Sequence, residues 1–102
     1  MNEIKIDKNS PNQFDTLPKG WVFYLLSGLN EELYAGYSAN LKVKLNYLYH
    51  KAMEGGIYQD MWNSVEKLNW VTYDRAISAL IHCKCYLAEN MPLYQYQIRP
   101  WA

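Results

Sequence analysis

Two tyrosines ten positions apart are the residues of this chain whose type and spacing could do chemistry. Tyr24 stands in the apolar run WVFYLL and Tyr34 in the run LYAGYS. Three lysines, Lys42, Lys44 and Lys51, follow within one predicted helix. Lysine ammonium groups can neutralise phosphates, so these three cations leave a local patch for a nucleic acid possible.

A strand, a turn and a second strand must position the two phenols. Aromatic and aliphatic residues fill 21–27 and 32–36, which is typical of strands. The polar loop SGLNEE between them contains the glycine that a hairpin favours. Cross-strand neighbours in an antiparallel pair lie within about 5.5 Å, so we expect Tyr24 and Tyr34 side by side.

Three further elements follow the hairpin. Residues 40–53 show helical spacing of apolar residues and end at Gly55-Gly56, 57–66 fit one or two helical turns, and 68–73 alternate as a third strand. A second main helix is predicted over 74–88, with a stripe of Ala76, Leu80, Cys83 and Leu87. Residues 93–98 alternate apolar and polar, as a terminal strand or an ordered strap. The predicted fold is α+β, with a small three-stranded antiparallel sheet flanked by two main helices.

The 102 residues predict one folded domain over 21–102, preceded by an extended arm at 1–20 that is ordered only where it is tied down. No apolar run approaches the roughly 18 residues of a membrane helix, and the polar start has no signal-peptide pattern. We therefore expect a cytoplasmic protein with no membrane partner. Cys83 and Cys85 should point to different helix faces, so neither a disulfide nor, with His82, a zinc site is expected.

Ten basic residues balance ten acidic ones, so the formal net charge is zero. A neutral chain has no overall attraction to DNA or RNA, which leaves local patches. The chain also has more aromatic residues than one small core needs. We expect some of Trp62, Trp70, Tyr94, Tyr96 and Trp101 to line a binding surface or a dimer contact, unless the arm or the strap covers them.

The hairpin and the helix that follows it resemble the GIY-YIG nuclease family. Residues 22–24 (VFY) stand where the first family triplet would be, with Val22 in place of its glycine, and 34–36 (YAG) stand at the second triplet. SANL at 38–41 matches the usual entry into the first helix. WVTY at 70–73, Arg75-Ala76, Lys84 and PLYQ at 92–95 resemble the third strand, the later helix and the closing segment.

The resemblance implies a phosphodiesterase site with one divalent cation. In that family a glutamate of the later helix holds the metal, an arginine of the earlier helix faces the phosphate, and the tyrosines flank the attacking water. Here the arginine position falls on Lys44 and the glutamate position on Leu80. Lysine lacks the bidentate geometry of arginine and leucine cannot ligate a hard cation. We therefore expect no metal and no cofactor.

The predicted function is a catalytically degenerate nuclease-like domain that binds nucleic acid or protein. Its remnant cleft would contain Tyr24, Tyr34, Tyr37 and Lys44, and nucleic-acid contacts would come from Lys42, Lys44, His50 and Lys51.

Three alternatives stay open. The chain could be a divergent active Mg²⁺-dependent endonuclease whose carboxylate comes from Glu54 or from a second chain. It could be a homodimeric interaction protein with no nucleic-acid role. Tyr24 and Tyr34 could also be core residues with hydroxyls hydrogen-bonded at the sheet edge.

Overall fold

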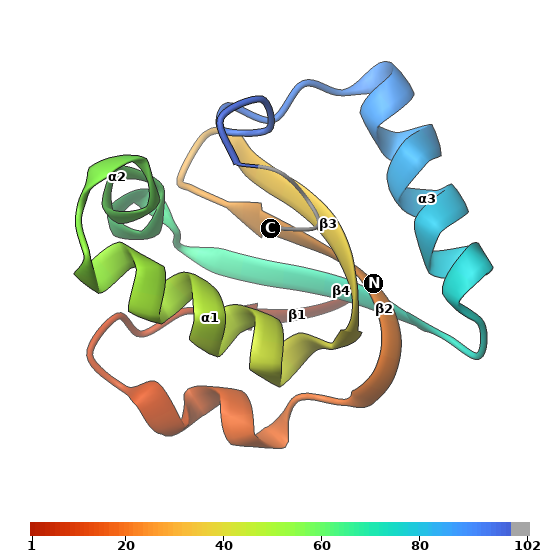
Figure 1. The fold of residues 1–102 in the computed structure, drawn as a ribbon, viewed down its shortest axis with the longest axis horizontal. Coiled ribbons are helices and arrows are strands. Elements are labelled where there is room, and N and C mark those ends of the chain that lie inside the picture. The colour runs from red at the N-terminus through yellow and green to blue at the C-terminus, as the bar shows by residue number, and fades with distance from the viewer. Residues whose placement is uncertain (99–102) are drawn as a thin grey trace.

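An antiparallel sheet of four strands in the order β1-β4-β2-β3 runs through the middle of the protein (Figure 1). The computed structural model describes residues 1–98. The strands are β1 Asn2–Lys5, β2 Lys19–Ser27, β3 Glu32–Asn40 and β4 Lys67–Tyr73. The α+β class and the antiparallel sheet are confirmed. The prediction of three strands is wrong, because the N-terminal segment supplies a fourth.

The additional strand, β1, pairs antiparallel with β4, with Ile4 opposite Leu68. It was missed because it has four residues and only one is apolar. Pairing with β4 gives hydrogen-bond partners to an edge that would otherwise be open. The N-terminal segment then forms a 3-10 helix, η1 Pro11–Thr16, and the buried ring of Phe14 joins the core.

The helices begin and end close to the predicted residues. They are α1 Leu41–Met53, α2 Gly56–Ser64 and α3 Ala76–Glu89. The Asn40 side chain accepts a hydrogen bond from the Val43 N–H (3.2 Å) and caps α1. Gly55 and Gly56 have φ values of 90° and 72°, which L-residues with a Cβ rarely adopt, and they join α1 directly to α2.

The two faces of the sheet carry separate cores because alternate strand residues point to opposite faces. We call the larger one the α1-side core. It contains Val22, Tyr24, Leu26, Leu33, Tyr34, Leu41, Leu45, Leu48, Met61 and Leu68 among others. The α3-side core contains Phe23, Leu25, Ala35 and Cys83. Figure 1 shows α1 and η1 on one side of the sheet and α3 on the other.

Helix α3 is oriented differently from the predicted stripe. Its buried residues are Ala79 and Cys83, whereas Ala76 is exposed. His82 fixes this orientation, because its ring stacks on Phe23 (centroids 4.0 Å apart) and its Nδ1 lies 2.6 Å from the Tyr73 hydroxyl. The cysteines diverge as predicted, since Cys83 is buried, Cys85 is exposed and both are free thiols.

The segment after α3 forms a strap along the outer edge of β3. The N–H groups of Leu93 and Tyr94 donate to the carbonyls of Glu32 (3.0 Å) and Leu33 (2.9 Å). The Gln95 amide then accepts from the Ala35 N–H and donates to the Ala35 carbonyl, both at 2.8 Å. One side chain thus supplies the two bonds that a neighbouring strand would make. Of the helices described, none combines the length and the apolar character needed to cross a membrane.

Candidate functional site

Tyr24 and Tyr34 lie side by side on the α1 side of the sheet. Tyr24 of β2 is opposite Gly36 of β3, and Tyr34 is opposite Leu26, so the two tyrosines are diagonal neighbours on one face. Their ring centroids are 6.2 Å apart and the rings are tilted by 40°. The juxtaposition expected from the hairpin is therefore present. Neither ring has any exposed surface.

The two hydroxyl groups are buried, and neither has a hydrogen-bond partner among the described residues. Burial is the main cause that raises the pKa of Tyr24 well above its ordinary value, and the neighbouring Tyr34 adds to the rise. Burial likewise raises the pKa of Tyr34. Both phenols are therefore neutral at physiological pH. They are part of the core, but their hydroxyls are not bonded at the sheet edge.

Gly36 lets the Tyr24 ring approach the backbone of β3 closely. A Cβ at position 36 would be 2.6 Å from the Tyr24 hydroxyl oxygen and 2.7 Å from its Cζ. Such distances are well inside van der Waals contact, so only glycine leaves room for the ring. The glycine of the YAG triplet is therefore explained by this close approach. Its φ lies outside the left-handed region.

Lys44 lies on α1, the helix whose buried residues pack in the same core as Tyr24 and Tyr34. It is half-buried, and the loss of hydration lowers the pKa of its ammonium group. The ammonium nitrogen lies 5.3 Å from the centroid of the Tyr47 ring, a distance at which a cation is attracted to an aromatic face. Residues 44, 47 and 51 share one helix face by their spacing.

Lys51 and Tyr58 continue the same surface onto α2. The Lys51 ammonium nitrogen is 5.9 Å from the ring centroids of both Tyr47 and Tyr58, so it lies between two rings. Lys51 also forms an ion pair with Glu54 at 3.5 Å. Burial, and then the nearby Tyr47 phenol, raise the pKa of Tyr58. We call Lys44, Tyr47, Lys51 and Tyr58 the lysine–tyrosine row, because cations and rings alternate along it.

The other predicted contact residues lie apart from this row. Lys42 is exposed and forms an ion pair with Asp15 of η1 at 3.0 Å. His50 is exposed, with its ring edge-on to Tyr49 at 5.7 Å. Tyr37 is opposite Phe23 and packs against the α3-side core, so the sheet separates it from Tyr24 and Tyr34.

Leu80, where the resemblance to the GIY-YIG family would place a glutamate, is half-buried on α3. That helix packs against the opposite face of the sheet from Tyr24 and Tyr34. Within residues 1–98, no group of three His, Cys, Asp or Glu side chains gathers closely enough to hold a metal ion.

The N-terminal segment and the strap cover some of the aromatic residues that one small core does not need. Trp62 is buried and meets the Phe14 ring of η1 edge-on at 6.0 Å. Trp70 and Tyr94 are half-buried against the α1-side core, whereas Tyr96 is largely exposed. Trp101 lies outside the described residues.

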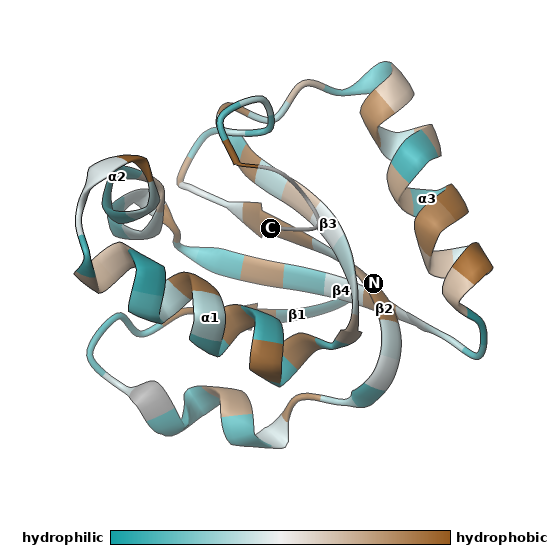
Figure 2. Cartoon of the chain, in the orientation of Figure 1, coloured by the Kyte–Doolittle hydropathy of each residue, from teal (hydrophilic) through white to brown (hydrophobic). Residues whose placement is uncertain are grey.

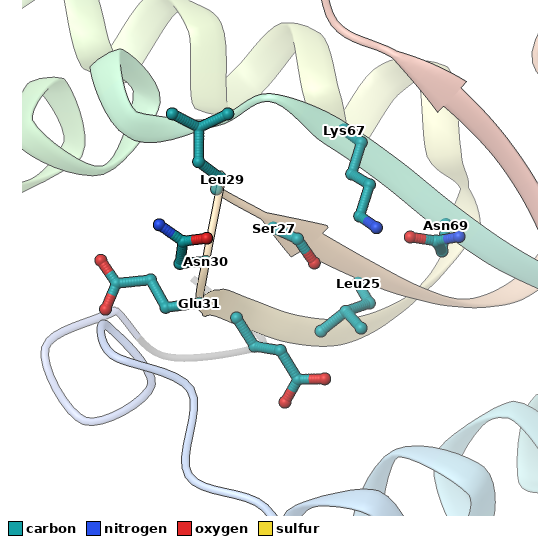
Figure 3. Close-up of a pocket in the computed structure, with 9 residues that line it drawn as sticks. Leu25, Ser27, Leu29, Asn30, Glu31, Lys67 and Asn69 are labelled. Carbon is teal, nitrogen blue, oxygen red and sulfur yellow. The ribbon is translucent and has the colours of Figure 1, made fainter.

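A separate polar hollow of about 360 Å³ opens at the hairpin end of the sheet (Figure 3). Figure 3 shows Ser27, Lys67 and Asn69 along one wall, with Asn30 and Glu31 across from them. Two of these groups are already engaged by β1, because Lys67 and Asn69 contact the Glu3 carboxylate at 3.7 and 3.0 Å. The lysine–tyrosine row does not contribute to this hollow.

Lys44 and Lys51 could be identified from the sequence, whereas the aromatic members of the row, Tyr47 and Tyr58, were missed. The spacing of Tyr47, three residues after Lys44 and four before Lys51, is a signal that could have identified it. Tyr58 carries no comparable signal, because its position depends on how α2 folds back against α1. Comparisons of the chain with protein-family models, with curated proteins and with solved structures gave no match.

Proposed function

We propose that this chain is a non-cleaving domain that binds single-stranded nucleic acid at the lysine–tyrosine row. The observation that carries the proposal is the alternation of ammonium groups and aromatic rings across α1 and α2, with separations of 5.3 to 5.9 Å. Proteins that bind single strands combine cations that contact the phosphates with rings on which bases stack. Double-stranded nucleic acid keeps its bases stacked on one another and offers no free base face to Tyr47 or Tyr58.

The absence of a cleaving activity is proposed from the residues at the two positions that the GIY-YIG resemblance makes catalytic. Lys44 can neutralise one phosphate charge, but it cannot form the two parallel hydrogen bonds of an arginine. Leu80 offers no oxygen to a metal, and the sheet lies between it and the tyrosine pair. A ligand held by Lys44 would therefore be bound without being activated for cleavage.

The charge of the chain sets the expected strength of binding. The net charge is zero and Glu54 pairs with Lys51, so few phosphates can be neutralised. Each phosphate contact on a single strand contributes a slope of about −0.7 to the dependence of log K on log salt. Two contacts, from Lys44 and Lys51, predict a slope of about −1.4 and a loss of affinity of about sevenfold between 50 and 200 mM salt.

Fluorescence anisotropy with a labelled 12-nucleotide single strand tests the proposal. We expect Lys44→Ala to weaken binding and to reduce the salt slope by about 0.7. Tyr47→Leu should weaken binding about fivefold or more at every salt concentration, because it removes base stacking. Lys19→Ala, at an exposed position on β2, is the control with the same charge change and should leave the slope unaltered.

Two results would contradict the proposal. One is an affinity that does not respond to Lys44→Ala or to Tyr47→Leu. The other is cleavage of a plasmid or a branched DNA in Mg²⁺ or Mn²⁺ that Tyr34→Phe abolishes, since this would identify an active nuclease.

A further inference from the structure

A row of three polar side chains crosses the sheet at its hairpin end. Ser27 of β2 is the register partner of Lys67 of β4 and of Glu32 of β3, and register partners point to the same face of a sheet. That face carries the α3-side core, because Leu25, two positions before Ser27, belongs to this core. Figure 2 shows hydrophilic and hydrophobic residues alternating along the start of β4. A cation and a carboxylate therefore flank one hydroxyl on one face.

The row lines the polar hollow of about 360 Å³ that Figure 3 shows. Ser27 is 6% exposed, and its hydroxyl has no hydrogen-bond partner among the described residues. In Figure 3 the side chains of Ser27 and Lys67 point toward the same space. Burying a hydroxyl without a partner costs free energy, so a polar ligand group in the hollow would supply the missing hydrogen bond. The volume lies at the small end of the range for ligand sites.

The two charged side chains of the row can still bind a ligand. The contact of Lys67 with the Glu3 carboxylate is 3.7 Å long, beyond an ordinary hydrogen bond, and an ammonium group has three donors. Glu32 is half-buried and forms no ion pair within residues 1–98. Burial, and then the nearby Glu32 carboxylate, raise the pKa of Tyr86 on α3. Glu32 is therefore turned toward the face on which Ser27 lies.

We propose that this hollow binds a free amino acid, with the ligand carboxylate at Lys67 and Ser27 and the ligand ammonium group at Glu32. Register partners lie about 5 Å apart between Cα atoms, so Lys67 and Glu32 are about 10 Å apart across Ser27. This separation leaves room for a small molecule. A ligand with a carboxylate alone would meet Glu32 as a like charge, and a ligand with an ammonium group alone would meet Lys67. A zwitterion complements both ends of the row.

Two leucines indicate the class of amino acid. Leu25 and Leu29 line the hollow together with the row. Leu29 is 83% exposed, so an aliphatic side chain on the ligand would remove apolar surface from water. The site lies on the opposite face of the sheet from α1, and it does not depend on nucleic-acid binding at the lysine–tyrosine row.

Amide chemical shifts of the isotope-labelled full chain, recorded as L-leucine is added up to about 20 mM, test this site. We expect shifts centred on Ser27, Glu32 and Lys67 that saturate with a Kd on the order of 1 mM. Two matched probes each lack one charge: 3-methylbutylamine has no carboxylate, and 4-methylpentanoate has no ammonium group. Each should bind at least about tenfold more weakly than L-leucine, because it leaves one end of the row facing a like charge.

Substitutions in the row assign the contacts. Ser27→Ala should weaken L-leucine binding about fivefold and Glu32→Gln about tenfold. Asp74→Asn removes an exposed carboxylate beyond the opposite end of β4 and should have no effect. Lys67→Gln should weaken the binding of L-leucine about tenfold without weakening that of 3-methylbutylamine, which has no carboxylate for Lys67 to bind. Circular dichroism confirms that each variant is folded.

Three results would overturn the proposal. One is the absence of shifts at the row with L-leucine at 20 mM. Another is a one-charge probe that binds as tightly as L-leucine. The third is a Lys67→Gln variant that loses as much affinity for 3-methylbutylamine as for L-leucine, because Lys67 would then act without contacting the ligand carboxylate.

Discussion

Replacing Gly36 by alanine tests the close approach that holds the tyrosine pair together. The added Cβ would meet the Tyr24 hydroxyl oxygen at 2.6 Å, its Cζ at 2.7 Å and its Cε1 at 3.0 Å. Ordinary contact between such atoms begins about 1 Å farther out. The ring is fully buried and cannot move into solvent, so it must shift against its neighbours in the α1-side core.

The magnitude follows from two opposing effects. Overpacking a close-packed core costs about 1–3 kcal/mol. Alanine also restricts the unfolded chain more than glycine does, which returns about 0.4–1 kcal/mol. We expect a net loss of about 1–2 kcal/mol. In a domain of this size, that loss of stability should lower the Tm by about 4–15 °C.

Urea unfolding of four chains measures the effect: the parent chain, Gly36→Ala, Tyr24→Leu and the double variant. All three of the nearest atoms to the new Cβ belong to Tyr24. When Tyr24→Leu is already present, Gly36→Ala should therefore be neutral or slightly stabilising, which gives a coupling free energy above about 1 kcal/mol. If the stability losses of the two single variants add up to that of the double variant within about 0.5 kcal/mol, the Tyr24 ring does not restrict the size of the side chain at position 36 and the reasoning is refuted.

Three further predictions concern stability. Tyr24 and Tyr34 have raised pKa values in the folded state, so their contribution to the free energy of unfolding is complete below the unfolded pKa of about 10. As the pH rises above that value, the contribution falls by about 1.4 kcal/mol per pH unit for each phenol. Tyrosinate absorbance and circular dichroism should therefore change together, and ionisation of both phenols while the chain is still folded would contradict this. Gln95→Ala should lower the free energy of unfolding by about 1–3 kcal/mol, because it leaves two buried backbone groups of Ala35 unpaired. The Ala35 amide hydrogen should then exchange faster with solvent, and an unchanged exchange rate would exclude the hydrogen bond from the strap. Asn40→Ala should lower the stability by about 1 kcal/mol by removing the cap of α1, whereas Asn40→Ser should retain most of it in thermal unfolding. An equal loss of stability in both variants would argue against capping.

Much of the fold could be predicted from the sequence, because local patterns determined it. The polar turn with Gly28 identified the hairpin, and the spacing of Leu41, Leu45, Leu48 and Ala52 identified α1 and its buried face. Strand β1 was missed because it has too few apolar residues to show alternation. The buried face of α3 was also missed, because most sides of this helix are apolar and the spacing of its apolar residues therefore does not indicate which side is buried.

The candidate site was predicted in part. Tyr24 and Tyr34 come together because register within a hairpin is a local property. Tyr37 was grouped with them on proximity along the chain, although three positions along a strand reverse the face to which a side chain points. Tyr58 depends on the packing of α2 against α1. Such contacts between elements carry no local pattern, so the lysine–tyrosine row could only be recognised from the structure.

Mapping the bound surface tests the central claim most directly. We would record amide chemical shifts of the isotope-labelled chain as a 12-nucleotide single strand is added at 20 mM salt, and repeat the titration at 200 mM salt. The proposed function predicts shifts concentrated at Lys44, Tyr47, Lys51 and Tyr58, and weaker binding at the higher salt. Absence of shifts at 20 mM salt, or shifts centred on another surface such as α3, would contradict it.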